Sequence, residues 1–201
     1  MKITKAKLFI TILTIAVLAF GVYNILWFRY VSTTFDPFLN SSHIQSVPDE
    51  NYDFWTPGRG GKFHSFRDVA GKGIVVDIVL PGYLTFGGNV SAITTTEIDE
   101  QDGVFIYVSE CAIGMTLFPR NMHFLLKITD YTTVEKMGEA VRLRSLVVDS
   151  AGTPLLDHPL NNIDPISLEE ELILYNKFYT QIETFFENIH YIFGDALKVN
   201  T

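Results

Sequence analysis

Hydrophobic positions form one unbroken run near the N-terminus, from Leu8 to Phe28, in which none of the 21 side chains carries a charge. At about 1.5 Å of rise per residue, a helix of this run would cross the roughly 30 Å hydrocarbon core of a bilayer. The pattern predicts a transmembrane helix over residues 8–28. A signal peptide cleaved after Ala19-Phe20-Gly21 is the alternative, because these residues form a small-x-small site.

The charges that flank the run predict its orientation. Three lysines precede it, namely Lys2, Lys5 and Lys7, whereas only Arg29 follows closely. Because positive residues favour the cytoplasmic side, residues 1–7 are expected in the cytoplasm and residues 30–201 outside it. The chain is therefore predicted to be a single-pass protein of the cell membrane, held through residues 8–28 as a signal-anchor.

Residues 29–72 show no sustained hydrophobic period, and prolines and glycines interrupt them. Their aromatic residues are too frequent for a purely disordered segment: Phe35, Phe38, Tyr52, Phe54 and Trp55. We expect an irregular tether that packs in part on a domain formed by residues 73–201.

From residue 74 to residue 148, β-branched and aromatic residues alternate with turn-forming residues. Seven short strands are predicted: Ile74–Leu80, Tyr83–Phe86, Val90–Thr96, Val104–Val108, Met115–Phe118, His123–Tyr131 and Ala140–Val148. Close turns such as Gly87-Gly88-Asn89 favour antiparallel neighbours. The segment therefore predicts a mostly antiparallel sheet, sandwich or half-barrel.

Apolar residues from Ser167 to Phe193 recur in steps of three and four, which is typical of an amphipathic helix. Ser167 and Glu170 match the capping box that begins many helices, and Gly194 is a typical helix end. We expect one long C-terminal helix that covers the open face of the sheet, and the fold class is α+β.

The charge balance limits the choice of partners. The chain has 15 basic and 23 acidic residues, and four of the bases belong to the N-terminal anchor. Residues 30–201 therefore hold 11 bases and 23 acids, a net charge of −12. Such a surface repels nucleic acid and anionic lipid headgroups, so neither is expected as a partner of the domain.

Three side chains are candidates for catalysis: Cys111, His123 and His158. Each is a residue type that serves as a nucleophile or base, but no catalytic motif surrounds any of them. Cys111 among apolar neighbours is typical of a buried strand thiol, and His158 lies between prolines in a loop. We expect no catalytic residue, with these three as the first to test.

Two further charged clusters are candidates for binding. Asp99 and Asp102 belong to an acidic turn that could hold calcium, but the turn does not match the calcium-loop pattern, so no metal or cofactor is expected. Arg142 and Arg144 alternate along a predicted strand and share one face, where they could bind an anionic group or pair with carboxylates.

Taken together, these features favour a non-enzymatic protein of the cell envelope that acts as a protein-interaction or assembly module. The aromatic stripe of the C-terminal helix, including Tyr175 and Tyr179, could receive a protein partner in the membrane or envelope. Two alternatives stay open. One is a membrane-tethered hydrolase-type enzyme, and the other is a small-ligand sensor or carrier with a pocket between the sheet and the C-terminal helix.

Overall fold

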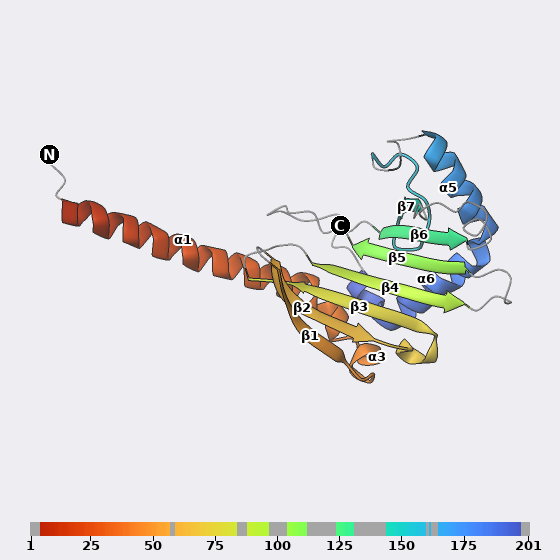
Figure 1. The fold of residues 1–201 in the computed structure, drawn as a ribbon, viewed down its shortest axis with the longest axis horizontal. Coiled ribbons are helices and arrows are strands. Elements are labelled where there is room, and N and C mark those ends of the chain that lie inside the picture. The colour runs from red at the N-terminus through yellow and green to blue at the C-terminus, as the bar shows by residue number, and fades with distance from the viewer. Residues whose placement is uncertain are drawn as a thin grey trace.

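A computed structural model describes residues 5–56, 59–83, 88–96, 104–111, 124–130, 144–159, 161 and 165–197. Figure 1 shows a long N-terminal helix projecting from a domain in which helices pack on one antiparallel sheet, so the predicted α+β class is confirmed. The helices are α1 (Lys5–Thr34), α2 (Asp36–Leu39), α3 (Ser42–Gln45), α5 (Pro165–Lys177) and α6 (Tyr179–Phe193). The strands are β1 (Glu50–Thr56), β2 (Arg59–Phe66), β3 (Ile74–Pro81), β4 (Asn89–Thr96), β5 (Val104–Cys111), β6 (Phe124–Asp130) and β7 (Arg144–Val148). Two short 3-10 helices follow β2 and α6, at Val69–Gly71 and Gly194–Leu197.

The helix α1 exposes its apolar side chains along most of its length. It is long and apolar enough to span a membrane, and no part of its most apolar stretch is buried against the rest of the described chain. Its polar side chains bond to the preceding turn of the same helix: the hydroxyls of Thr11 and Thr14 donate to the carbonyls of Lys7 and Ile10, both at 2.9 Å. Because of these bonds, the two threonine hydroxyls do not need water as a hydrogen-bond partner.

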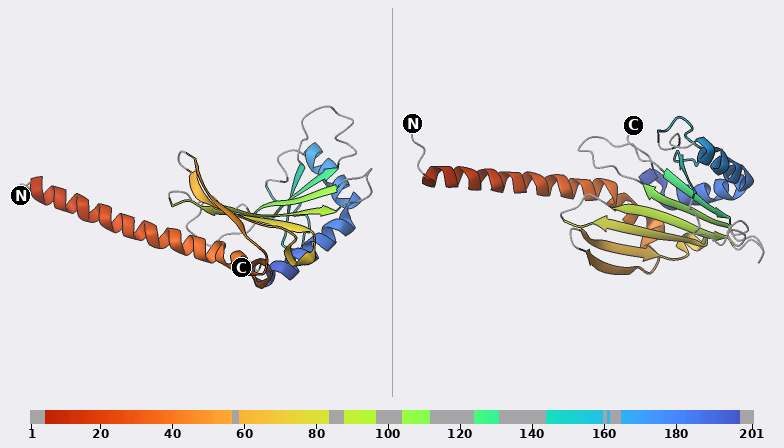
Figure 2. Two further views of the ribbon diagram at one scale, coloured as in Figure 1. Left: turned by 60° about the horizontal axis from the view of Figure 1, so that its bottom comes forward. Right: turned by 45° about the horizontal axis from the view of Figure 1, so that its top comes forward.

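The seven strands of the sheet are hydrogen-bonded in sequence order, β1-β2-β3-β4-β5-β6-β7, and every neighbouring pair is antiparallel. This is a meander, and the described strands form a single twisted sheet rather than the two sheets of a sandwich (Figure 2). The register is irregular between Val108 and Cys111 in β5.

The period of two in β3 separates the two faces of the sheet. Ile74, Val76 and Ile78 are fully buried, whereas Val75 and Asp77 between them are only half-buried. Helix α6 covers the buried face with a stripe of apolar side chains: Ile182, Phe185, Phe186, Ile189, Ile192 and Phe193. Figure 2 shows α6 on one side of the sheet, so the core lies between this helix and the inner face of the strands.

The segment 29–72 differs from the irregular tether that its sequence predicts. Helix α1 continues to Thr34, two short helices follow, and β1 and β2 extend the sheet. Phe35, Phe38 and Ile44 are at most 1% exposed, and the rings of Phe38 and Phe193 are 5.0 Å apart. The reason is the burial of these apolar side chains in the core of the domain, which favours ordered packing despite the polar composition.

The C-terminal helix also differs from its prediction, because it consists of two helices, α5 and α6. They are separated at Phe178, whose φ of −109° and ψ of 22° are not helical. The Phe178 side chain is buried, so the change of direction places it in the core. Helix α5 begins at Pro165, before the predicted cap Ser167, since proline suits the first turn of a helix.

Strands β3 to β7 overlap five of the seven predicted strands. Of the other two, Tyr83–Phe86 begins at a residue that lies in a turn, and its residues 84–86 lie outside the described part of the chain. Residues 115–118 also lie outside it.

Candidate functional site

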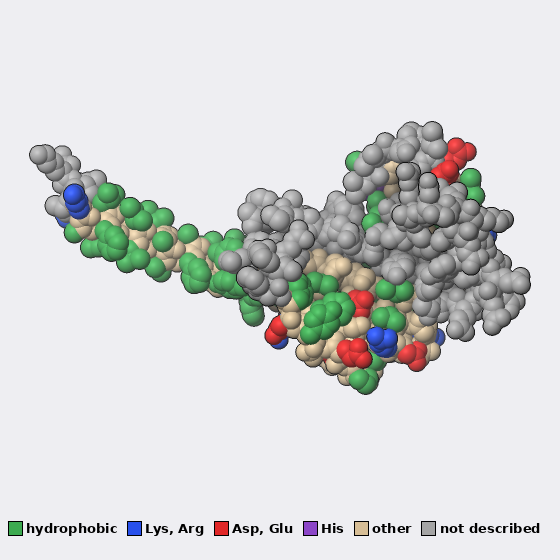
Figure 3. All heavy atoms as spheres, in the orientation of Figure 1, with side chains coloured by type: hydrophobic (Ala, Val, Ile, Leu, Met, Phe, Trp, Pro, Cys, Tyr) green, Lys and Arg blue, Asp and Glu red, His purple; other side chains and the backbone are tan. Residues whose placement is uncertain are grey.

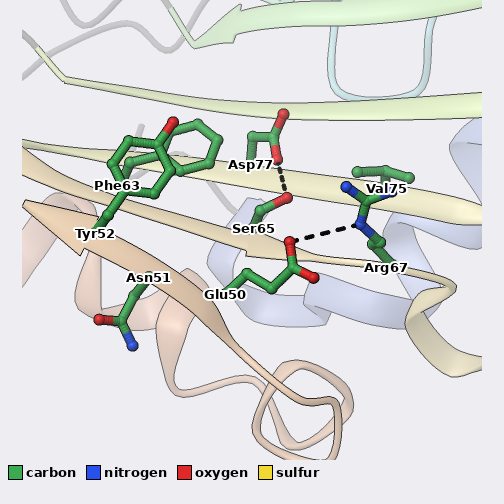
Figure 4. Close-up of a pocket in the computed structure, with 8 residues that line it drawn as sticks. All are labelled: Glu50, Asn51, Tyr52, Phe63, Ser65, Arg67, Val75 and Asp77. Atoms are coloured by element: carbon green, nitrogen blue, oxygen red, sulfur yellow. Dashed lines mark hydrogen bonds and ion pairs between the residues drawn. The ribbon is translucent and has the colours of Figure 1, made fainter.

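The outer face of the sheet, opposite α6, carries a hollow over β1, β2 and β3, which we call the outer hollow (Figure 4). Its volume is about 420 Å³. Its lining residues come from three neighbouring strands and the residue after β2: Glu50, Asn51, Tyr52, Phe63, Ser65, Arg67, Val75 and Asp77. In β3, alternation places Val75 and Asp77 on this face and buries Val76 and Ile78 on the inner one.

One half of the outer hollow is aromatic. Tyr52 on β1 and Phe63 on β2 occupy directly opposite positions, and their rings stack with centroids 4.8 Å apart and planes 30° apart. Tyr52 is 57% exposed, so one face of this aromatic pair is open to solvent. An exposed tyrosine of this kind offers apolar area and a π surface to a ligand.

The other half of the outer hollow is acidic. The Ser65 hydroxyl donates to Oδ1 of Asp77 at 2.7 Å, which holds that carboxylate in place. Arg67 Nε lies 3.8 Å from Oε2 of Glu50, and both side chains are about 70% exposed. Water screens so long and exposed an ion pair, so Glu50 and Arg67 remain available to other charged groups.

A second structured surface joins α1 to the end of β3, and we call it the α1–β3 junction. The Tyr83 ring lies 5.7 Å from that of Tyr23 and 5.4 Å from that of Trp27, between centroids. Trp27 Nε1 donates to the Gly82 carbonyl at 3.1 Å. The Tyr83 hydroxyl donates to Asn24, and the Tyr23 hydroxyl donates to the Tyr83 carbonyl.

The junction explains the single strongly polar residue of the apolar run. The Asn24 amide donates to the Phe20 carbonyl at 2.6 Å and accepts from Tyr83, so both ends of the amide have partners. A groove of about 550 Å³ runs beside it, lined mostly by apolar atoms of α1 and by Tyr83. The end of the sheet is therefore fixed against the C-terminal third of α1.

Replacing Tyr83 with alanine is expected to loosen the α1–β3 junction, because about 2–3 kcal/mol of ring contact and hydrogen bonding would be lost. Tyr83→Phe is the matched control, since it removes only the bond to Asn24. With the native cysteine replaced (Cys111→Ser), spin labels on Ile15→Cys and Asp157→Cys measure the distance between α1 and the domain. The distance distribution should broaden in Tyr83→Ala and much less in Tyr83→Phe. Equal widths in both variants would contradict a structural role for the Tyr83 ring.

The structure places two of the catalytic candidates. Cys111 is the last residue of β5 and pairs with Phe124, which follows His123 in sequence. His158 is half-buried in the loop after β7, where its backbone N–H donates to the Leu155 carbonyl at 2.9 Å. His123 itself lies outside the described residues.

The binding candidates are placed in part. Asp99, Asp102 and Arg142 lie outside the described residues, and Arg144 begins β7 opposite Ile128. Within the described part of the chain, no group of three or more His, Cys, Asp or Glu side chains is placed to hold a metal ion.

The structure brings Tyr175 and Tyr179 together, with ring centroids 6.0 Å apart in an edge-to-face arrangement. Tyr175 is buried and Tyr179 is 49% exposed, so only the second offers a surface to a partner. Burial raises the pKa of Tyr175 above the ordinary 10.0, and the neighbouring Tyr179, Asp149 and Glu183 raise it further. Tyr175 is therefore a neutral core residue at physiological pH.

Several residues of these surfaces escape prediction from the sequence. Glu50, Tyr52 and Asp77 meet only because β1, β2 and β3 pair in one register, and Tyr83 meets α1 across a long sequence separation. The one signal for the junction is Asn24, a polar side chain in an apolar run that needs a partner.

Comparison with known proteins adds no relative: no model of a protein family, no curated protein and no solved structure matches this chain.

Proposed function

We propose that this chain is a single-pass membrane protein whose extracytoplasmic domain acts as a non-enzymatic protein-interaction or assembly module. The observation that carries the proposal is the exposure of α1, whose large apolar side chains face outward from Leu8 to Phe28 while its end is fixed to a folded domain. Figure 3 shows these side chains along the helix, with basic side chains at its N-terminal end.

Insertion of α1 in a bilayer accounts for its surface. In water, side chains such as Phe9, Ile25 and Phe28, which are 67–70% exposed, would be unfavourably hydrated. In lipid, the same side chains are stabilised, and the polar groups of Thr11, Thr14 and Asn24 already have partners within the chain.

The proposed orientation has the N-terminus in the cytoplasm and residues 30–201 outside. Lys5 and Lys7 are at the N-terminal end of α1, and Arg29 is the next basic residue. The aromatic rings of the α1–β3 junction suit the headgroup region at the opposite end of the span. The domain is then held at the outer membrane surface, where its concentration near other envelope proteins is high.

The outer hollow supports an interaction role for the domain. It holds an exposed aromatic pair beside carboxylates on an uncovered part of the sheet. Tyrosine and phenylalanine are enriched in surfaces that bind other proteins. The small-ligand alternative has less support, because Ile182, Phe185 and Phe186 of α6 are at most 2% exposed against the sheet. So little exposure leaves no room for a ligand beside them.

Cysteine labelling tests the topology. In a Cys111→Ser background, a single cysteine at Asp157 should react with a membrane-impermeant maleimide in intact cells. A single cysteine at Thr4 should react only after lysis. The Cys111→Ser protein without added cysteine is the control, and the reverse labelling pattern would contradict the orientation. Loss of an N-terminal tag from the mature protein would show cleavage and contradict the anchor.

A pull-down from detergent-solubilised membranes tests the interaction role. We expect the chain to recover a defined membrane or envelope protein. Repeated recovery of the chain alone would contradict the role.

A further inference from the structure

The two edge strands of the sheet, β7 and β1, differ in the hydrogen-bond partners of their outward-facing backbone groups. At the β7 edge, the side chain of Asn161 takes the place of a neighbouring strand. Val147 N donates to Asn161 Oδ1 at 2.8 Å, and Asn161 Nδ2 donates back to the Val147 carbonyl at 3.0 Å. Leu155 N also donates to that carbonyl, and Val148 forms a bridge with Pro154. Within the described residues, these contacts close the C-terminal end of the β7 edge to another strand.

The β1 edge has no such cover within the described residues. All seven residues of β1 pair with β2 on one side. On the other side, none of the described residues is hydrogen-bonded to a β1 backbone group, and β1 forms the lower border of the sheet in Figure 1. Alternate residues of an edge strand direct both N–H and C=O outward, so β1 offers on the order of three or four such residues.

The outer hollow lies directly beside this free edge. Side chains of a strand added next to β1 would alternate between the two faces, and those on the outer face would reach Glu50 and Tyr52. Asp77 lies two strands further in, on the same face. Figure 3 shows an apolar patch beside carboxylates over β1 to β3. Among the described residues that line the hollow, only Arg67 is basic, and its pair with Glu50 is long and exposed.

We propose that the β1 edge binds an extended segment of a partner protein, with lysine or arginine at alternate positions, as a further strand of the sheet. The proposal rests on the proposed interaction function and names its site and the chemistry of its partner. Backbone hydrogen bonds to β1 provide affinity, and the alternate basic side chains pair with Glu50 or lie over the Tyr52 ring. Asp77 is too far from an added strand for direct contact, but its carboxylate adds negative charge to the same face. The net charge of −12 on residues 30–201 favours a cationic segment over other extended segments.

A second copy of this chain fits the edge poorly. An antiparallel pairing of two β1 strands about their midpoint places Asp53 of one copy directly opposite Asp53 of the other. Like charges in directly opposite positions destabilise a strand pair. The two acidic domains would also repel each other as a whole.

A synthetic peptide of alternating lysine and valine, as long as β1 and carrying a fluorescent label, tests the site. The full chain is placed in nanodiscs of zwitterionic lipid, so that the peptide is not attracted to the membrane, and binding is followed by fluorescence anisotropy. We expect saturable binding that is lost when glutamate replaces lysine. Two methylated peptides, one with the odd-numbered and one with the even-numbered amides N-methylated, each lack donors along one edge. The peptide methylated on the edge that faces β1 should not bind, and the other should still bind.

Two matched variants test the residues. Glu50→Lys with Asp77→Asn changes the charge of the outer hollow, and asparagine keeps the acceptor for Ser65. Glu187→Lys with Asp157→Asn makes the same charge change at exposed positions elsewhere. The first variant should weaken peptide binding by at least about tenfold, and the second should leave it nearly unchanged.

The possible results separate the site from the function. Absence of peptide binding, equal binding of both methylated peptides, or equal weakening by both variants would overturn the β1 site. In the membrane pull-down, recovery of the same partner by wild type and by the Glu50→Lys/Asp77→Asn variant would also refute the site, while the interaction function would stand. Recovery of no partner by either protein would contradict the proposed function itself.

Discussion

Replacing Phe186 with alanine is expected to lower the free energy of unfolding by about 3–5 kcal/mol, because a large aromatic ring is lost from the centre of the core. Phe186 is 1% exposed and packs edge-to-face on Phe185, with ring centroids 5.7 Å apart. Its ring also fills the space over Gly152, where a Cβ atom would lie 2.4 Å from a ring carbon. Truncation would therefore leave a cavity beneath the sheet that its neighbours cannot fill.

Urea unfolding of the full chain in detergent micelles measures the effect. Tyr191→Ala is the matched control, because Tyr191 lies on the same helix and is 58% exposed. Its loss should cost at most about 1 kcal/mol. Similar losses for the two variants would show that α6 does not provide the core of the domain in solution.

Replacing Asn161 with alanine is the second large effect, with an expected loss of about 2–4 kcal/mol. Asn161 is 5% exposed and makes three hydrogen bonds: one from Val147 N, one to the Val147 carbonyl, and one of 2.8 Å to the Leu155 carbonyl. Alanine would leave Val147 N without an acceptor in a site with little access to water. The Val147 and Leu155 carbonyls would each lose one of two donors and keep their bonds from Leu155 N and His158 N.

The same substitution should also change the association of the protein. Without the Asn161 amide, the β7 edge gains an open donor at Val147 N and loses the side chain that covers it, which favours edge-to-edge pairing between molecules. Sedimentation of micelle-bound protein should then show concentration-dependent association. Asn176→Ala removes an exposed amide from α5 and should change neither stability nor association. If Asn161→Ala behaves like Asn176→Ala, the capping role of Asn161 is wrong.

The elements that sequence patterns predict well are those whose own residues determine them. The charge-free run predicts α1, and continuous β-branched residues predict β3 from Ile74. By contrast, β1 and β2 contain Asn, Asp, Gly and Lys, which are infrequent in strands. These two strands form because the rest of the sheet offers an edge to pair with, and strand propensity alone does not reveal that edge.

The two surfaces were beyond sequence patterns for a related reason. The outer hollow needs the register that sets Tyr52 opposite Phe63 and Ser65 opposite Asp77. The break at Phe178 has no glycine or proline to mark it, because burial of that ring decides the local backbone. The Asn161 amide resembles an ordinary loop residue in the sequence, and only its position beside Val147 gives it a role.

The strictly sequential order of the strands has a consequence for biogenesis. If residues 30–201 cross the membrane from N- to C-terminus, β1 emerges first, and each later strand finds its neighbour already in place, so sheet formation can follow export. The inner face stays uncovered until α6 emerges, because Phe38 and Ser41 near the start of the domain contact Phe193 and Ile192 near its end. We therefore expect the nascent domain to expose its apolar face throughout translocation and to become resistant to envelope proteases only after the last helix is released.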